Sequence, residues 1–165
     1  MPPPRYDEDQ GNQLQPLKGI TVVTLEHAIA APFATRQLAE LGARGIKIER
    51  PETRDFARRH DKRARGLSSH FVWANRSKES PALVVNSSDA GAILQRLIME
   101  KADVVVQNLA PRLLRCYHRA IGIADRSNGP RMDALPALGQ HTDAILAELG
   151  IDSAAVAALH LAKAV

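Results

Sequence analysis

The sequence is short of several residue types, and each shortage excludes a class of protein. Cys116 is the one cysteine among 165 residues, which excludes an internal disulfide framework and fits a reducing compartment. No apolar run approaches the roughly 18 residues that a membrane-spanning helix needs. Residues 1–16 also lack the apolar core of a secretory signal. We therefore expect a cytoplasmic protein with no membrane partner.

Sequence motifs that commonly bind cofactors are missing as well. There is no GxGxxG and no GxxxxGK[ST], so dinucleotide and P-loop binding lack their usual sequence support. The histidines show no metal-ligand spacing with one another or with Cys116, so we expect surface or partly packed imidazoles and no metal site. The histidines are His27, His60, His70, His118, His141 and His160.

The charge is modestly positive and concentrated in one segment. A net charge of +4 and a pI near 9.6 favour anionic partners. Residues 54–65 hold six Arg and Lys side chains with two aspartates between them. Nucleic-acid binding would use stacking aromatics beside such a patch, and only Phe56 is available, so we regard a nucleic-acid partner as unlikely. A solvated surface and capture of a cofactor phosphate both stay open for this segment.

The first half of the fold follows from an alternation of apolar patterns. Residues 19–25 form a β-branched run that is typical of a buried strand. A helix of about ten residues is expected between Pro32 in its first turn and Gly42 at its C-terminal cap. Residues 45–50 predict a second strand, in which Ile46 and Ile48 alternate with Lys47 and Glu49.

The pattern then repeats and ends in a helical tail. Residues 81–86 predict a third strand, a helix with Ser87 or Ser88 as N-cap follows, and residues 103–109 predict a fourth strand. This alternation indicates an α/β fold with a Rossmann-like, mostly parallel sheet and flanking helices. In such sheets ligands bind at the carboxyl ends of strands, so the loops that begin at Glu26, Arg50 and Asn108 are site candidates.

We expect four segments along the chain. Residues 1–15 are a polar, mobile arm; 16–122 form the Rossmann-like part; 123–136 are a linker; and 137–165 hold two short helices divided at Gly150. The stretch SHFVWANRSKES, residues 69–80, has no clear helix or strand period and is expected to be a loop.

Three stretches together resemble the N-terminal segment of the family III CoA-transferases, the CaiB/BaiF group. They are PLKGITVVTLEHAIAAPFATRQLAELGARGIKIERP, SSHFVWANRSKES and DVVVQNLAP, and the resemblance covers residues 16–122. Within the family they are most similar to mesaconyl-CoA and citramalate CoA-transferases. The C-terminal LGQHTDAILAELGIDSAAVAAL resembles the end of the same family. The catalytic middle region is missing between these parts, which indicates an internally shortened member.

The resemblance implies that Phe71 and Trp73 are packing anchors, and it implies a partial site for CoA or acyl-CoA. Its contacts would come from the loop after the first strand, from basic side chains that bind phosphates and from strand-end amides. The implied CoA-binding residues are Ala28, Ile29, Ala30, Arg50, Asn75, Lys78, Asn108 and Arg115. The family's nucleophilic aspartate is not found, because Asp125 and Asp133 do not stand in a matching phrase, so no catalytic residue is assigned.

Two functions from different classes stay open. The chain is either a shortened CoA-transferase relative that keeps part of the CoA site, or a non-catalytic binding or regulatory module. The first predicts CoA binding, with a simple homodimer as one possible assembly. The second predicts pairing with a full-length paralogue. A decayed deletion product without activity is a third possibility.

Overall fold

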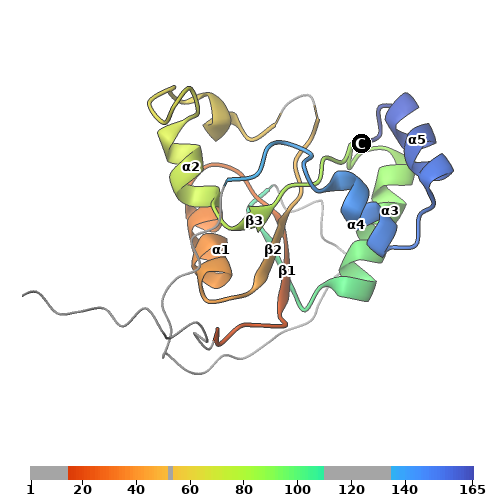
Figure 1. Ribbon diagram of the computed structural model, residues 1–165, viewed down its shortest axis with the longest axis horizontal. Helices are drawn as coiled ribbons and strands as arrows, with labels where there is room; N and C mark the ends of the chain where they lie inside the picture. Colours follow the sequence, from red (N-terminus) through yellow and green to blue (C-terminus); the bar gives the residue numbers. More distant parts are fainter. Residues whose placement is uncertain (1–14, 52–53, 110–134) are drawn as a thin grey trace, which may run out of the picture.

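A computed structural model describes residues 15–51, 54–109 and 135–165 of the chain (Figure 1). The expected arm at 1–15, apart from Gln15, and most of the expected linker at 123–136 lie outside these residues. The strands are β1 (Thr21–Leu25), β2 (Arg44–Lys47), β3 (Lys78–Glu79) and β4 (Val104–Gln107). The helices are α1 (Ala30–Glu40), the short 3-10 helix η1 (Phe56–Arg59), α2 (Ser69–Asn75), α3 (Ser88–Lys101), α4 (Thr142–Glu148) and α5 (Ser153–Leu161).

The four strands form one parallel sheet in the order β3-β2-β1-β4. Val23 in β1 lies opposite Ile46 in β2 on one side and opposite Val105 in β4 on the other. Because every pair is parallel, all four strands end at the same edge of the sheet, which we call the carboxyl edge. The predicted α/β class with a Rossmann-like, mostly parallel sheet is confirmed.

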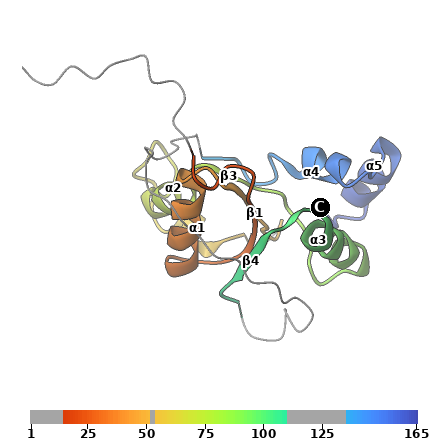
Figure 2. The same ribbon diagram turned by 90° about the horizontal axis from the view of Figure 1, so that it is seen from below.

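Helices cover both faces of this sheet. Figures 1 and 2 show α1 and α2 on one side and α3, α4 and α5 on the other. Successive residues of a strand point to opposite faces, so Val22 packs in a small cluster with Leu17 and Ala43, whereas Val23 joins the main core. The main core combines strand residues with α3 and α4, namely Val23, Leu25, Ile46, Ile48, Leu83, Ala90, Ile93, Leu94, Leu97, Ile98, Ile145, Leu146 and Leu149.

The predicted helix signals are confirmed at α1 and α3. Pro32 stands in the first turn of α1, and Gly42 follows its end with a φ of +99°, a conformation that glycine adopts without steric cost. The N-cap of α3 is Ser87, whose side chain accepts a hydrogen bond of 3.2 Å from the Ala90 backbone amide. Such a cap satisfies one of the amide groups that a helix start leaves without a partner.

The prediction of a third strand over 81–86 is wrong. The strand that pairs with β2 is β3, and only Ala82 continues the pairing, as a bridge to Glu49. Pro81 has no backbone N–H to donate. Leu83 donates to the Glu49 carbonyl at 2.9 Å, but Ala82 donates to the Thr142 hydroxyl at 2.9 Å and Val84 to the Ala164 carbonyl at 2.8 Å. Residues of the C-terminal segment thus accept the hydrogen bonds that a neighbouring strand would accept in a wider sheet.

The prediction of a loop over 69–80 is also wrong, because Ser69–Asn75 is helix α2. Its seven residues are too few to show a repeating apolar period, but the Ser68 hydroxyl caps it by accepting from the Phe71 amide at 3.3 Å. Phe71 is buried, as expected of a packing anchor. Trp73 is 43% exposed and stacks on Phe33, so its role as a core anchor is not supported.

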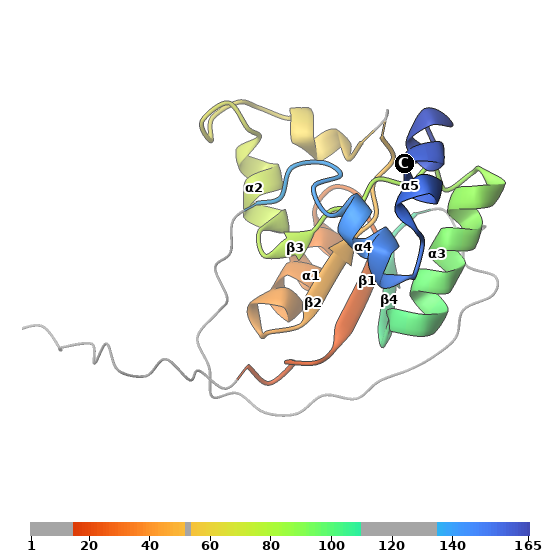
Figure 3. The ribbon, with the colours of Figure 1, turned by 45° about the vertical axis from the view of Figure 1, so that its right-hand side comes forward.

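The C-terminal segment forms the two predicted helices, with Asp152 as the N-cap of α5. Figure 3 shows α4 and α5 beside α3. Arg44 in β2 connects α4 to the sheet, because its guanidinium bonds both Glu79 in β3 and Glu148 in α4 at 2.7–2.8 Å. These two carboxylates raise the pKa of Arg44 above its usual value. Among the described residues, no helix has both the length and the apolar character needed to cross a membrane.

The burial of α4 predicts that the C-terminal segment unfolds together with the sheet. Replacing Leu146, which is 1% exposed, by alanine should lower the free energy of unfolding by about 2–5 kcal/mol. Leu161→Ala removes the same atoms from a residue that is 86% exposed and should change it by less than about 0.5 kcal/mol. Chemical denaturation of both variants measures this, and a small effect of Leu146→Ala would contradict the shared core.

Candidate functional site

Two charged side chains of β2 and its extension lie inside the protein. Lys47 is 1% exposed and Glu49 is 3% exposed. Alternation with Ile46 and Ile48 is typical of a strand with one polar face, but helices cover both faces of this sheet, so the polar residues are buried too. Because a buried charge without a partner is costly, each must be neutralised nearby.

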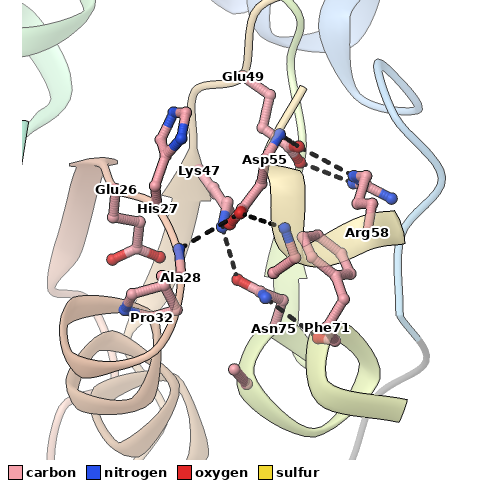
Figure 4. A network of polar contacts seen from close by, with 12 residues as sticks. Glu26, His27, Ala28, Pro32, Lys47, Glu49, Asp55, Arg58, Phe71 and Asn75 are labelled. Carbon is pink, nitrogen blue, oxygen red and sulfur yellow. Dashed lines mark hydrogen bonds and ion pairs between the residues drawn. The ribbon is translucent and has the colours of Figure 1, made fainter. Parts of the chain in front are cut away.

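Lys47 is neutralised by Asp55, which precedes η1. Its ammonium Nζ lies 2.7 Å from Asp55 Oδ2 and 2.9 Å from Asn75 Oδ1, both buried (Figure 4). It also stands 5.0 Å from the centroid of the Phe71 ring, within cation–π distance. Burial acts to raise the pKa of Asp55, but the nearby Lys47 ammonium outweighs it, so the pKa lies below the ordinary value.

A second buried pair joins β1 to β3. Lys78 Nζ lies 2.7 Å from Glu26 Oε1 and donates to the carbonyls of Pro32 at 2.9 Å and Ala74 at 3.1 Å. Asn75 Oδ1 is a fourth acceptor at 3.2 Å. Lys78 thus has four acceptors within reach, one more than the three N–H donors of its ammonium group. Burial and the positive charge of Lys47 lower the pKa of Lys78 to about 8, against the opposing effect of Glu26.

The third pair brings a residue of the basic segment inward. Arg58 donates through Nε and Nη2 to the two carboxylate oxygens of Glu49, at 2.9 and 2.6 Å, and its guanidinium carbon lies 3.9 Å from the Phe71 centroid. Burial acts to raise the pKa of Glu49, but Arg58 outweighs it, and the pKa is below its usual value. We call the three pairs the ionic network: Glu26–Lys78, Lys47–Asp55 and Glu49–Arg58.

The ionic network and the side-chain amide of Asn108, which follows β4, together hold the loop of residues 26–30. Asp55 Oδ1 accepts from the Ala28 amide at 3.3 Å, and Ala28 has a φ of +64°, which is unusual for a residue other than glycine. Asn108 holds His27 from the other side, since its side-chain amide both accepts from the His27 N–H and donates to the His27 carbonyl, each at 2.9 Å. The carboxyl edge therefore presents a loop of fixed backbone conformation.

Apolar side chains are exposed beside this loop. Ile29 is 47% exposed and Phe56 is 51% exposed. The Phe56 ring lies 6.2 Å from the His27 ring and 5.9 Å from the His60 ring, centroid to centroid. Exposed aromatic surface next to small residues such as Ala28 suits the face of a planar ring.

The structure brings some of the sequence-predicted residues together and separates others. Ala28 and Ile29 lie in the loop, Ala30 begins α1, and Asn108 adjoins the loop. Asn75 and Lys78 are buried within the ionic network. Arg50 is half-buried three residues after the end of β2, and Arg115 lies outside the described residues. Their assignment as CoA contacts stays a prediction.

Sequence reasoning missed most of the ionic network. Glu26 stood in a candidate loop and Lys78 was a predicted CoA contact, but no partner was assigned to Lys47 or Glu49. Asp55 and Arg58 belonged to the basic segment, for which a solvated surface and phosphate capture both stayed open. A usable signal was present: a lysine in the inner strand of a sheet covered on both faces must have a buried counterion. The described residues contain no group of three His, Cys, Asp or Glu that could hold a metal ion. A cavity of about 380 Å³ between α4 and α5 includes none of the predicted CoA residues.

Comparison with known proteins shows which protein family this chain resembles. Residues 17–126 match the model of CoA-transferase family III. The chain is 39% identical over 101 residues to acetyl-CoA:oxalate CoA-transferase from Acetobacter aceti, which covers 60% of this chain and 25% of that one. It is 35% identical over 101 residues to human succinyl-CoA:glutarate CoA-transferase, covering 61% and 23%. The matched part is thus about a quarter of each relative.

Solved structures give the same result. A CaiB/BaiF family protein from Brucella suis has a TM-score of 0.54 and 32% identity, covering 59% of this chain and 26% of that chain. A protein from Mycobacterium tuberculosis has a TM-score of 0.54 over 89% of this chain and 31% of its own, at 22% identity, a likeness of fold alone. The sheet and helices described above therefore recur in proteins of this kind.

The buried ammonium of Lys78 predicts a pH-dependent stability. Its pKa falls from the ordinary 10.5 to about 8 on folding, so between these values the unfolded chain binds more protons than the folded one. The free energy of unfolding should therefore rise with pH across this window and lose that gain as pH falls through 8. Denaturation from pH 7 to 11 measures it. Lys78→Met should remove this rise, whereas exposed Lys62→Met should keep it; equal profiles for both variants would contradict the prediction.

Proposed function

The chain belongs to CoA-transferase family III, and we propose that it binds CoA or an acyl-CoA at the carboxyl edge of its sheet. The observation that carries the proposal is the loop of residues 26–30, whose backbone Asp55 and Asn108 hold from two sides. A loop that is ordered before binding loses less conformational entropy when a ligand arrives. Residues 16–122 would then be the CoA-binding part of the chain.

The proposed contacts fall into two groups. Ala28, Ile29 and Ala30 would approach the adenine, aided by the exposed ring of Phe56. Arg50, in the segment that follows β2, would supply charge-assisted hydrogen bonds to a phosphate. Arg115 is proposed as a further phosphate contact on the family resemblance alone.

Asn75 and Lys78 are proposed to act through the position of the loop. Lys78 already donates to Glu26 and to backbone carbonyls, and Asn75 Oδ1 accepts from both Lys47 and Lys78. A direct phosphate contact would require Lys78 to leave Glu26, which would then be buried without a counterion. Their predicted importance for CoA binding is kept, but as support for the site.

The acyl group and the acid acceptor are proposed from the relatives' names alone. Oxalate and glutarate, named in two relatives, are short dicarboxylates. We propose the same substrate class here, and the finer assignment to mesaconyl-CoA and citramalate stays a prediction, as does a cytoplasmic location. A homodimer, or a dimer with a full-length paralogue, is the proposed assembly.

Isothermal titration of the purified chain with CoA tests the proposal. We expect weak, saturable binding, and no heat at millimolar CoA would refute it. Asn108→Ala should weaken binding about tenfold, because it frees the His27 backbone at a loss of about 1.4 kcal/mol. The control is Asn86→Ala, which alters an exposed asparagine on a turn and should bind CoA like the original chain.

Catalysis by the chain alone is not expected, since no nucleophilic aspartate is assigned. A transfer assay with acetyl-CoA and oxalate should give no product with the purified chain. Product formation that Asn108→Ala reduces and Asn86→Ala does not would show that a nucleophile exists within this chain. If product forms only with a longer family member that co-purifies with the chain, the pairing module is the better description.

A further inference from the structure

Two arginines at the α1–α2 contact share a single carboxylate. Arg36 Nε lies 2.6 Å from Glu40 Oε1, one turn along α1, and Arg76 Nη2 at the end of α2 pairs with the same oxygen. Arg36 and Glu40 are buried, at 8% and 7% exposure. Figures 1 and 2 show α1 and α2 side by side. Two guanidinium groups against one carboxylate leave one positive charge uncompensated within this cluster.

Two hydrogen-bond donors of the cluster are buried without a partner. Arg36 Nη1 and Arg76 Nε make no hydrogen bond within the part of the chain that the structure describes. Leaving a buried donor unsatisfied is costly, more so for a charged group. Arg58 shows the contrast, because its Nε and Nη2 bond both oxygens of Glu49, one guanidinium to one carboxylate. The α1–α2 cluster therefore has too few acceptors for its guanidinium donors, whereas one carboxylate serves one guanidinium in the Arg58–Glu49 pair.

An aromatic pair stands next to these donors. The rings of Phe33 and Trp73 stack with centroids 5.0 Å apart and 10° between their planes. The guanidinium carbon of Arg36 lies 5.3 Å from the Trp73 centroid and 5.9 Å from that of Phe33. Trp73 is 43% exposed and Phe33 38% exposed, so the pair borders solvent. A small ligand bound to the Arg36 guanidinium would therefore lie close to the Trp73 ring.

We propose that Arg36 and Arg76 form a binding site for a small oxyanion, a carboxylate or a phosphate group, between α1 and α2. The oxyanion would accept from the two unpartnered donors and balance the second guanidinium charge, since guanidinium groups make strong charge-assisted hydrogen bonds to carboxylate and phosphate oxygens. None of these residues is among the proposed CoA contacts. The site therefore goes beyond the proposed function and can be tested separately from it.

Trp73 provides the readout, because it is the one tryptophan in the sequence. The full chain is titrated with inorganic phosphate and, separately, with succinate, while its emission is recorded against sodium chloride at the same ionic strength. We expect a saturable change with at least one oxyanion and none with chloride. The two titrations distinguish a phosphate site from a carboxylate site. Emission that responds to none of them, or equally to chloride, would overturn the proposal.

Two variants with opposite expected effects on oxyanion affinity distinguish a binding site from a purely structural cluster. Arg76→Gln should weaken oxyanion binding about tenfold or more, because a charge-assisted hydrogen bond is lost. Glu40→Gln removes the competing carboxylate and should tighten binding about tenfold, with a larger rise in melting temperature on adding oxyanion than the original chain shows. A purely structural cluster would give no tightening in Glu40→Gln.

The control keeps the change in charge but moves it away from the site. Lys163→Gln removes one positive charge from the segment after α5 and should leave oxyanion binding unchanged. If Arg76→Gln and Lys163→Gln weaken binding equally, the anion responds to the net charge and the proposed site is refuted. Loss of CoA binding in the same variants is not expected, so failure of one proposal does not imply failure of the other.

Discussion

The buried ammonium of Lys47 is the constraint on which the carboxyl edge depends. It ends an inner strand of a sheet that helices cover on both faces, where an unpaired charge would cost several kcal/mol. Asp55 and Asn75 supply its oxygen partners, so the segment before η1 and the end of α2 must both dock against β2. The same Asp55 then fixes the Ala28 amide. One buried charge thus determines the conformation of the loop that we propose for CoA binding.

Because the pairs of the ionic network are connected, they stabilise the edge as a unit. Asn75 Oδ1 accepts from both Lys47 and Lys78, and Glu49 accepts from the Asp55 backbone amide as well as from Arg58. Moving any one member would leave another charge buried without its partner, so partial opening is costly. This coupling explains why residues far apart in the chain can hold one loop rigidly.

The sequence predicts what depends on local pattern. The helix at α3, with its Ser87 cap and the apolar side chains that follow, and the parallel order of β1, β2 and β4 follow from periodicity and capping. The third strand was misplaced because the amides of Ala82 and Val84 bond to the distant C-terminal segment, which no local pattern announces. The inward position of Lys47 was likewise missed, since alternation alone cannot tell a solvated face from one covered by helices.

Whether a positive charge can bind an anion depends on the partners that it already has. Within the basic segment 54–65, Arg58 is neutralised by Glu49, and Asp61 accepts hydrogen bonds from the Arg63 amide and from Ser69. Backbone amides and the Ser69 hydroxyl lower the pKa of Asp61 to about 2, so it stays charged. A buried excess of positive charge lies between α1 and α2, where Arg36 and Arg76 share the carboxylate of Glu40. A count of charges along the sequence therefore identifies where cations are frequent, whereas the affinity for an anion depends on where they lack a partner.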